Sequence, residues 1–358
     1  MLIMGFDGTS LTVRLRVLLA TMQPAGVILF KRNIEEPGQT HALLREVQKT
    51  ASSRMFLCVD LEGGTVDRLR DVIAPVPSVA DIAATGSRKL FWRHGRIVGT
   101  EARALGFNTD FAPVFDLQLE ASRNVLGSRA VSPDPGKTIL YAREFLRGLQ
   151  GAKVLGCGKH FPGLGEADLD SHGSLPIIRK PWKRMWNEDL LPYRELGRDI
   201  PFVMVAHAAY PDVTGNAVPA SLSKKWMSDT LRKKIGYRGL IITDDLDMGG
   251  VLAAATVENA AVETLRAGAD IFLVCQKEES VLRAYEAVFR RAERDRTFAH
   301  LVAQKSRRVL AAKKKAFALK APMAPPPSQK TVDRIRRELW AFGEEVRANT
   351  LALVEVGQ

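Results

Sequence analysis

An acid and an imidazole stand two positions apart at Asp170 and His172, inside a stretch that reads GKHFPGLGEADLDSHGSLP from 158 to 176. The stretch has neither helical nor strand periodicity, so we expect a long loop, and a loop of this length usually carries function. In an extended chain the two side chains point the same way, and the carboxylate can orient the imidazole and favour its protonated form. The pair therefore predicts a general acid/base. A solvent-exposed histidine without a catalytic role is the alternative.

Two adjacent carboxylates, Asp244 and Asp245, follow the apolar run of GLIITDDLDMGG at 239–250. Neighbouring side chains of a strand point to opposite sides, so we expect only one of the two to face a site at the strand end. A carboxylate in that place can act as a nucleophile. Capping of the following helix by either aspartate is the alternative.

Three more positions could bind a polar ligand. Asp60 ends another apolar run in VDLEGGTVDRLR, at 59–70, where two glycines permit a tight turn before Arg68. An aspartate there suits hydrogen bonds to the vicinal hydroxyls of a sugar, and a structural ion pair with Arg68 is the alternative. Arg129 lies in the glycine-containing segment NVLGSRA. Alone it is weak evidence, since most lone arginines are only solvated.

Lys159 and His160 open the same stretch as the acid and the imidazole. The step from Gly158 to Lys159 lacks the upstream glycine and the following Ser or Thr of a nucleotide-phosphate loop. His160, His172 and His207 could together bind a metal ion, but their spacing matches no common ligand motif. We therefore expect neither a nucleotide nor a metal cofactor.

The elements that must position these residues alternate between short apolar runs and helical patterns. Strands are predicted at 26–30, 56–60, 108–114, 153–157, 202–206, 240–243 and 271–275, with 2–6 as a possible eighth. Helices are predicted at 39–50, 89–105, 138–149, 226–234 and 257–267. Short apolar strands between helices predict a parallel sheet that is buried on both faces.

An open, doubly wound α/β sheet and a closed (β/α)8 TIM-type barrel share this pattern. Polar residues end several separate strands, and a barrel gathers all those ends at one mouth, so we expect the barrel. The barrel is predicted as a single domain over 1–300, followed by a C-terminal helical extension over 301–358. A proline-rich break at 321–328 divides the extension into helices at 301–319 and 331–353.

The composition fits a globular protein. The net charge of +12 could suit an acidic partner, yet the basic residues are spread over helices, with the densest runs at 313–315 and 334–337. We expect solvated helix faces rather than a nucleic-acid surface. No apolar run approaches the length of a membrane span, and Cys58, Cys157 and Cys275 have the placement of reduced core thiols. A soluble, cytoplasmic protein is the expectation.

Together these motifs resemble the family 3 glycoside hydrolases, and within them the single-domain bacterial β-N-acetylglucosaminidases of the NagZ group. The matching segments run in family order over the first 280 residues or so: GFDG, GVILFKRNI, VDLEGG, NTDFAPVFD, NVLGSRA, KHFPG with DSH, ITDDLDM and AGADIFLVC. Leu61, Thr65 and Leu164 depart from the family pattern, which usually has glutamine, arginine and histidine there.

The resemblance implies a retaining, exo-acting hydrolase in which Asp244 is the nucleophile and His172, supported by Asp170, is the acid/base. It implies that five residues bind the N-acetylglucosamine: Asp60, Arg68, Arg129, Lys159 and His160. The implied substrate is a muropeptide from cell-wall recycling, N-acetylglucosamine linked to 1,6-anhydro-N-acetylmuramic acid with or without peptide, acted on by a monomer without cofactor. A family 3 β-glucosidase or β-xylosidase, a phosphorylase and a non-enzymatic sugar-binding protein are the alternatives.

Overall fold

Eight parallel strands form the centre of the protein. The structure is a computed structural model that describes residues 1–171 and 173–356, with side chains up to residue 351. The strands are ordered β6-β3-β2-β1-β10-β9-β8-β7. Backbone hydrogen bonds join the two ends of this order, since Asp110 N donates to Leu155 O and Cys157 N donates to Ala112 O, both at 2.8 Å. The sheet therefore closes into the predicted (β/α)8 barrel, and the open-sheet alternative is wrong.

The barrel strands coincide with all the predicted runs except one. Their bounds are β1 Leu2–Met4, β2 Gly26–Ile28, β3 Phe56–Val59, β6 Thr109–Asp110, β7 Cys157–Phe161, β8 Phe202–Val205, β9 Leu240–Asp245 and β10 Ile271–Val274. Two further strands, β4 (Leu61–Gly63) and β5 (Val66–Asp67), form an antiparallel hairpin at the end of β3.

Strand β7 corrects the prediction for this part of the chain. We predicted a strand at 153–157 and a loop from residue 158, whereas the strand occupies 157–161. Lys159 and His160 are therefore strand residues, and both are buried. From the sequence pattern alone, Lys159 and His160 are too polar for a buried strand. In the structure, acidic side chains from neighbouring segments pair with them and offset the free-energy cost of burying them. The loop begins only at residue 162.

Alternate strand residues build two layers of core. Residues such as Ile3, Met204 and Leu273 fill the barrel, and their neighbours pack outward against the helices. The three cysteines belong to the inner layer, and all are buried, free thiols. Burial raises the pKa of each thiol above its ordinary value, which keeps the thiols unreactive. The prediction of core cysteines is confirmed.

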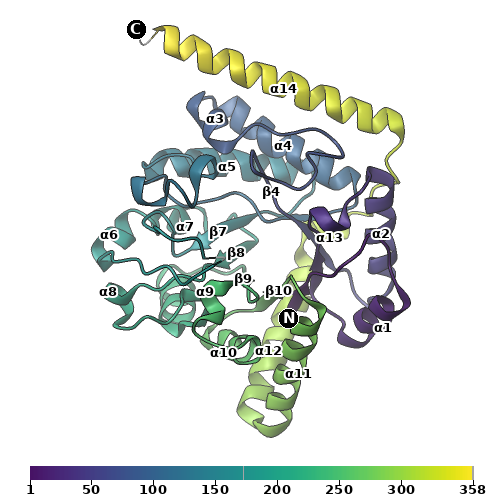
Figure 1. Cartoon of the computed structure of the whole chain (residues 1–358), viewed down its shortest axis with the longest axis vertical. Helices are drawn as coiled ribbons and strands as arrows, with labels where there is room; N and C mark the ends of the chain where they lie inside the picture. The colour runs from purple at the N-terminus through teal and green to yellow at the C-terminus, as the bar shows by residue number, and fades with distance from the viewer. Residues whose placement is uncertain (172, 357–358) are drawn as a thin grey trace.

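Helices surround the barrel (Figure 1). Their bounds are α1 Val13–Met22, α2 Pro37–Lys49, α3 Val79–Ala84, α4 Arg88–Ala104, α5 Pro135–Gly151, α6 Trp182–Asn187, α7 Leu191–Leu196, α8 Pro211–Thr214, α9 Gly249–Leu252, α10 Val257–Ala267, α11 Glu278–Arg294 and α12 Arg296–Lys315, with a π-helix at Lys225–Lys234. Helices α4 and α5 approach closely because two glycines meet the opposite backbone. A Cβ on Gly95 would lie 2.0 Å from Phe145 O, and one on Gly148 would lie 2.3 Å from Trp92 O.

The chain ends in a long helix that crosses over α3 and α4 (Figure 1). Helix α12 leads into the short helix α13 (Phe317–Lys320), and the proline-rich segment then leads into α14 (Gln329–Val356). The side chains that α14 buries recur at alternating spacings of three and four residues: Val332, Ile335, Leu339, Phe342 and Val346. This spacing gives the helix one apolar stripe, which faces the barrel helices.

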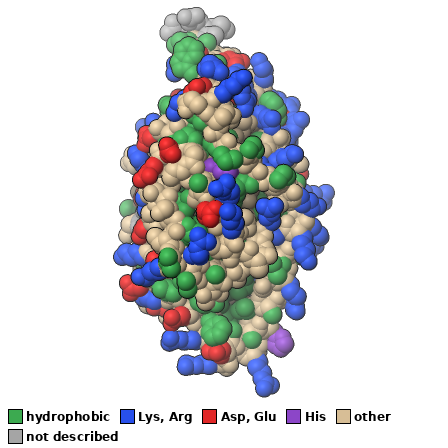
Figure 2. Space-filling model, turned by 90° about the vertical axis from the view of Figure 1, so that its right-hand side faces the viewer, with side chains coloured by type: hydrophobic (Ala, Val, Ile, Leu, Met, Phe, Trp, Pro, Cys, Tyr) green, Lys and Arg blue, Asp and Glu red, His purple; other side chains and the backbone are tan. Residues whose placement is uncertain are grey.

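Charge is spread over the surface. Figure 2 shows Lys and Arg side chains from one end of a face to the other, with acidic side chains among them. Many of the cations are paired with acids on the same helix, as Lys233 is with Asp229 and Arg290 is with Glu286. Over the described part of the chain, no helix has both the length and the apolar character needed to cross a bilayer.

Candidate active site

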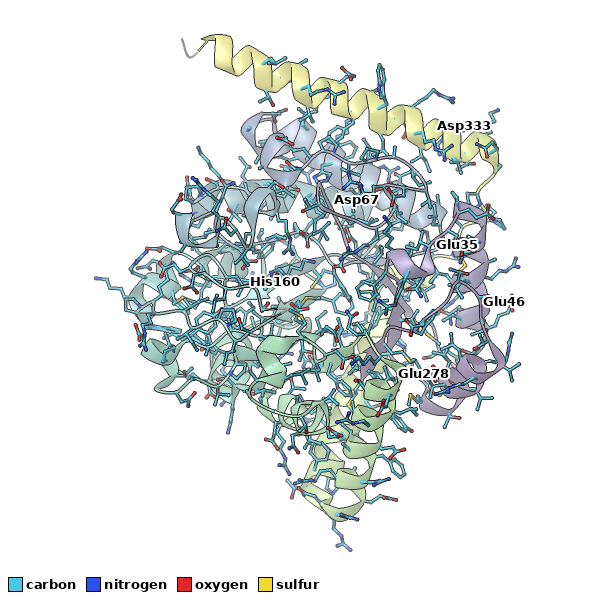
Figure 3. The ribbon with its side chains drawn as sticks, in the orientation of Figure 1. Glu35, Glu46, Asp67, His160, Glu278 and Asp333 are labelled. Atoms are coloured by element: carbon cyan, nitrogen blue, oxygen red, sulfur yellow. The ribbon has the colours of Figure 1, made fainter. Side chains whose placement is uncertain are left out.

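The predicted site residues gather at the C-terminal ends of the barrel strands, around a cavity of about 130 Å³. Figure 3 shows His160 near the middle of the molecule. His172 lies outside the described residues. All the other predicted site residues line this one cavity: Asp60, Arg68, Arg129, Lys159, His160, Asp170 and Asp244. The ends of β3, β7 and β9 thus converge with the segments that carry Arg68, Arg129 and Asp170, which is the arrangement of a (β/α)8 active site.

Glu62, which sequence reasoning missed, organises the cationic wall of the cavity. Its buried carboxylate accepts two hydrogen bonds from Arg129, at 2.7 and 2.9 Å, and lies 2.6 Å from Lys159 Nζ. Burial favours the neutral acid, but the charges and hydrogen bonds of Arg129 and Lys159 outweigh it and hold the pKa of Glu62 well below its usual range. The same pairing overcomes burial and raises the pKa of both cations. All three groups are ionised and fixed in place.

Asp60 continues this network toward the cavity. Its Oδ1 accepts a hydrogen bond from Lys159 Nζ at 2.9 Å, and its Oδ2 lies 3.9 Å from an Arg68 nitrogen. The ion pair that we considered as an alternative therefore exists, yet both side chains also line the cavity. A polar ligand would meet carboxylate acceptors beside ammonium and guanidinium donors, which suits the adjacent hydroxyls of a sugar.

Asp244 and Asp245 have different surroundings, although both border the cavity. Asp245 is tied to the backbone, because its Oδ1 accepts from Cys275 N at 2.9 Å and from Asp247 N at 3.1 Å. Burial raises the pKa of Asp245 to about 6. We expected only one of the pair to face the site, whereas both border the cavity; they differ in that backbone N–H groups hold the Asp245 side chain.

Asp244 is kept ionised by the groups around it. Burial alone would raise its pKa, but electrostatic interaction with His160 and His207, the Asp245 N–H at 2.9 Å and Lys159 together lower it below its usual value. His207 donates from Nε2 to the Asp245 carbonyl at 2.9 Å, and its Nδ1 lies 2.7 Å from Ser221 Oγ. A partly buried yet ionised carboxylate at the cavity is suited to nucleophilic attack.

The loop over 162–176, which we call the site loop, reaches the cavity with Asp170 and Ser171. The Ser171 carbonyl accepts a hydrogen bond from Gly250 N at 2.9 Å, in helix α9 just after Asp244 and Asp245. The Asp170 carbonyl accepts hydrogen bonds from Gly173 N at 3.1 Å and from Ser174 N at 3.3 Å. The loop segment that carries Asp170 is therefore docked beside the two carboxylates of β9.

Comparison with known proteins identifies the family. The model of the glycosyl hydrolase family 3 N-terminal domain matches residues 9–312. This chain belongs to glycoside hydrolase family 3. A β-hexosaminidase of Pseudomonas aeruginosa is 35% identical over 290 residues, which cover 81% of this chain and 86% of that protein. A β-hexosaminidase of Bordetella parapertussis is 36% identical over 280 residues, which cover 76% and 78%.

Solved structures agree with the sequence relatives. A family 3 β-N-acetylglucosaminidase from a Paenibacillus species has a TM-score of 0.90 and 31% identity, over 96% of this chain and 67% of its own. NagZ from Neisseria gonorrhoeae, in complex with N-trifluoroacetyl-D-glucosamine, has a TM-score of 0.76 and 25% identity, over 98% and 97%. The resemblance drawn from the motifs is confirmed, and this family 3 enzyme is a glycoside hydrolase similar to β-hexosaminidases.

Asp116 is the second residue of the glycoside hydrolase site that sequence reasoning missed. It is buried, and its carboxylate accepts hydrogen bonds from the ring and backbone of His160 and from the backbone of Leu164. Both missed residues carried a signal. Glu62 stands two positions after Asp60, as alternate strand residues on one face do. Asp116 ends the segment NTDFAPVFD (108–116), two positions after the strand predicted at 108–114.

The three departures from the family pattern lie in different places. Leu164 is buried and lines the cavity with an apolar side chain. Leu61 is buried in strand β4, where its backbone N–H donates to Asp110 Oδ1 at 2.9 Å. Thr65 is exposed in the turn between β4 and β5. Only Leu164 changes the chemistry of the cavity wall directly.

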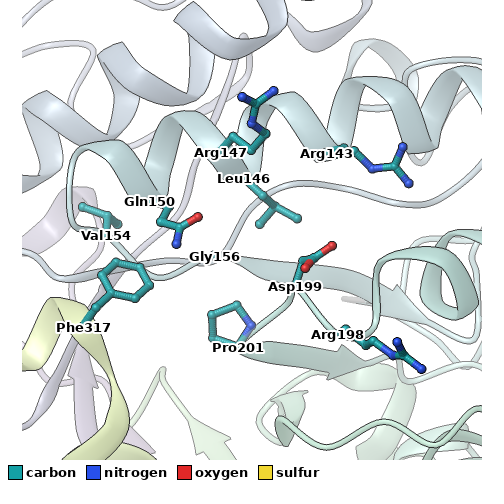
Figure 4. A pocket seen from close by; sticks show the side chains of 10 residues that line it. All are labelled: Arg143, Leu146, Arg147, Gln150, Val154, Gly156, Arg198, Asp199, Pro201 and Phe317. Carbon is teal, nitrogen blue, oxygen red and sulfur yellow. The ribbon is translucent and has the colours of Figure 1, made fainter.

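A larger cavity, of about 390 Å³, lies at the other end of the strands (Figure 4). It lies between α5 and the chain that enters β7 and β8, and Arg143, Arg147, Arg198 and Asp199 project around it. These polar side chains are exposed on the surface. Because (β/α)8 enzymes act at the C-terminal ends of their strands, this cavity is not the active site.

The residues with described side chains offer no cluster of three or more His, Cys, Asp or Glu groups that could hold a metal ion. His160 and His207, two of the three histidines considered as ligands, instead use ring nitrogens for bonds to Asp116, Ser221 and the Asp245 carbonyl. Their chemistry at this site is that of hydrogen-bonding groups next to a carboxylate.

Proposed function

We propose that this β-N-acetylhexosaminidase is an exo-acting, retaining enzyme that removes the non-reducing terminal N-acetylglucosamine from muropeptides. The observation that carries the proposal is the ionised Asp244 carboxylate at a cavity whose wall is the network of Asp60, Glu62, Lys159 and Arg129. A fixed anion for the anomeric carbon and fixed polar groups for the hydroxyls are what a glycosidase requires.

The reaction proceeds in two displacements. The Asp244 carboxylate attacks the anomeric carbon and forms a glycosyl ester, while His172 gives a proton to the departing glycosidic oxygen. His172 then takes a proton from water, which attacks the same carbon and releases Asp244 with retention of configuration. Asp170 orients the imidazole and supports its charge. Docking of the Asp170 segment beside β9 supports this assignment.

Five residues bind the sugar in the first subsite: Asp60, Arg68, Arg129, Lys159 and His160. Asp60 accepts hydrogen bonds from vicinal hydroxyls, and the three cations and the His160 ring supply donors. Their mutual ion pairs hold them in the geometry of the bound state before the sugar arrives, which lowers the entropic cost of binding.

The natural substrate that we propose is N-acetylglucosamine linked to 1,6-anhydro-N-acetylmuramic acid, with or without peptide. The N-acyl glucosamine bound to the NagZ structure of Neisseria gonorrhoeae supports recognition of an N-acyl sugar. The excess of positive charge, +12 over the chain, favours approach of a substrate that bears carboxylates. We place the enzyme in the cytoplasm, as a monomer, in peptidoglycan recycling.

Asp244→Ala tests the nucleophile. With an aryl β-glycoside of N-acetylglucosamine, we expect turnover to fall by at least about 10³-fold, without loss of the folded state by circular dichroism. Retained turnover would contradict the assignment. Asp170→Asn tests the dyad, and Asp168→Asn is its matched control, since Asp168 is exposed on the same loop.

Three comparisons separate the alternatives. Aryl glucosides and xylosides should turn over far more slowly than the N-acetylglucosaminide, and equal rates would favour a β-glucosidase or β-xylosidase. With a phosphorylase, added phosphate would raise the rate and N-acetylglucosamine 1-phosphate would form. We expect neither effect. Mass spectrometry of anhydro-muropeptide digests should show the loss of one N-acetylglucosamine, and binding without turnover would indicate a sugar-binding protein.

A further inference from the structure

Lys180 is a buried cation beneath the site loop and outside the cavity. Its side chain has no exposed surface, and its Nζ lies 2.5 Å from Asp189 Oδ2, 2.8 Å from Glu188 Oε2 and 3.5 Å from Glu166 Oε1. Glu188 and Asp189 belong to the turn between α6 and α7, whereas Glu166 belongs to the site loop. One ammonium group thus joins the loop to the body of the barrel.

The first two carboxylates already neutralise Lys180. Burial penalises the ammonium, but the nearby negative charges of Asp189, Glu188 and Glu166 more than offset this and raise the pKa of Lys180. A buried cation needs a close counter-ion, and Asp189 alone provides one. Glu166 is therefore not required for burial of the charge. Its contact with Lys180, and with Arg184 at 3.1 Å, serves to hold the loop.

The start of the site loop packs against the Lys180–Asp189 ion pair. Gly163 packs so closely on Asp189 that an added Cβ would lie 2.7 Å from the Asp189 Cβ, and its φ of +132° favours glycine. Its carbonyl accepts a hydrogen bond from Tyr210 Oη at 2.8 Å. The loop is thus held at Gly163 and at Glu166 by one pair of residues, four positions before Asp170.

We propose that Lys180 is a positioning residue for the reaction, which acts through Glu166 to hold the loop segment with Asp170 at the cavity. The proposal rests on the proposed function, because it takes the proton donor to be on this loop. A displacement of about 1 Å in a reacting group can cost about 100-fold in rate. The contact therefore controls protonation of the leaving group and leaves the sugar-binding wall on β3 and β7 unchanged.

The decisive variant is Glu166→Gln. It removes the negative charge with which the site loop contacts Lys180 but keeps Lys180 paired with Asp189, so the folded state should persist. Lys180→Met removes the whole connection, and Lys180→Arg should restore part of it. Lys183→Met is the matched control, because Lys183 is an exposed lysine only three residues further along the chain, in α6. Thermal unfolding of each variant measures the folded fraction under assay conditions.

The readout is the dependence of kcat/KM on the leaving group. A phenyl glycoside of N-acetylglucosamine needs protonation of its oxygen, whereas a 2,4-dinitrophenyl glycoside hardly does. In Glu166→Gln and Lys180→Met we expect kcat/KM to fall about 10- to 100-fold for the phenyl glycoside and by less than about threefold for the dinitrophenyl glycoside. A purely structural role of Lys180 would lower kcat/KM equally for the two glycosides.

Each outcome decides a separate point. Equal losses on both substrates, or unchanged kinetics in Glu166→Gln, would overturn the role of Lys180. Asp170→Asn, assayed with the same two glycosides, tests the proposed function itself. If Asp170→Asn shows the selective loss and the Lys180 and Glu166 variants do not, the positioning proposal fails alone. If Asp170→Asn shows no selective loss, the dyad on the loop is wrong.

Discussion

The carboxylate of Asp116 accepts hydrogen bonds from both the ring and the backbone of His160. Its Oδ2 lies 2.6 Å from His160 Nδ1 and 3.2 Å from the His160 backbone nitrogen, and its Oδ1 accepts from Leu164 N at 2.7 Å. Because the carboxylate accepts, Nδ1 carries a proton, and Nε2 is the ring nitrogen left for a ligand. Asp116 thus fixes the orientation of the His160 ring and the start of the site loop together.

Asp116→Asn should weaken sugar binding more than it weakens the fold. The amide keeps the shape but replaces one carboxylate oxygen by an N–H₂ group, so at least one of the three donors loses its acceptor. We expect KM for the aryl N-acetylglucosaminide to rise about tenfold or more, with a loss of about 1–3 kcal/mol in the free energy of unfolding. Steady-state kinetics and urea unfolding measure the two effects. An unchanged KM would show that His160 does not need this carboxylate.

The barrel was predictable because its strands are short, apolar throughout and separated by helices. Only a sheet buried on both faces produces that pattern, and several polar strand ends favour the closed form. The error at β7 has one cause. Sequence patterns judge burial one residue at a time, whereas Lys159 and His160 are buried together with Asp60, Glu62 and Asp116, which come from other strands and loops.

Sequence reasoning can propose site residues where one motif contains both members of a pair. Asp170 with His172 and Asp244 with Asp245 are local pairs, so spacing alone draws attention to them. Glu62 and Asp116 act through partners that are 67 and 44 residues away in sequence. No local pattern contains such a contact, and only the closure of the barrel creates it.

Glu62→Gln should damage both binding and stability. The variant leaves the buried Lys159 and the partly buried Arg129 without their shared anion, and breaking a buried ion pair costs about 3–5 kcal/mol. We expect that loss in urea unfolding, together with a rise in KM of about tenfold. Glu120→Gln is the control, since the exposed Glu120–Arg123 pair should contribute less than about 1 kcal/mol. Equal effects of the two variants would contradict the central role of Glu62.

Lys313→Met should stabilise the protein at neutral pH. Burial lowers the pKa of Lys313 to about 8 from an ordinary value of 10.5. Between these values the unfolded chain binds more protons than the folded one, so stability rises as the pH rises from about 8 to 10.5. At pH 7 the buried charge is a cost, and its removal should add about 1–3 kcal/mol.

The difference between wild type and Lys313→Met should shrink as the pH approaches 10.5, which urea unfolding over a pH series measures. Lys314→Met is the control, because Lys314 is the exposed neighbour on α12. It should change stability by less than about 0.5 kcal/mol at every pH. A destabilised Lys313→Met variant at pH 7 would show that the ammonium group is worth more to the fold than its burial costs.

Phe342→Ala should show that α14 stabilises the barrel without taking part in catalysis. The Phe342 ring is fully buried and stacks on His94 at 6.0 Å between centroids. Burial lowers the pKa of His94 to about 3, so its ring is neutral, and the Phe342 ring contributes to this burial. Truncation should cost about 3–5 kcal/mol in the free energy of unfolding. Because no described side chain of α14 lines the active-site cavity, kcat/KM of the folded enzyme should change by less than about threefold.

Trp340→Ala, at an exposed position of the same helix, should cost less than about 0.5 kcal/mol in the free energy of unfolding. Equal costs for the two variants would mean that α14 is not held by its buried stripe.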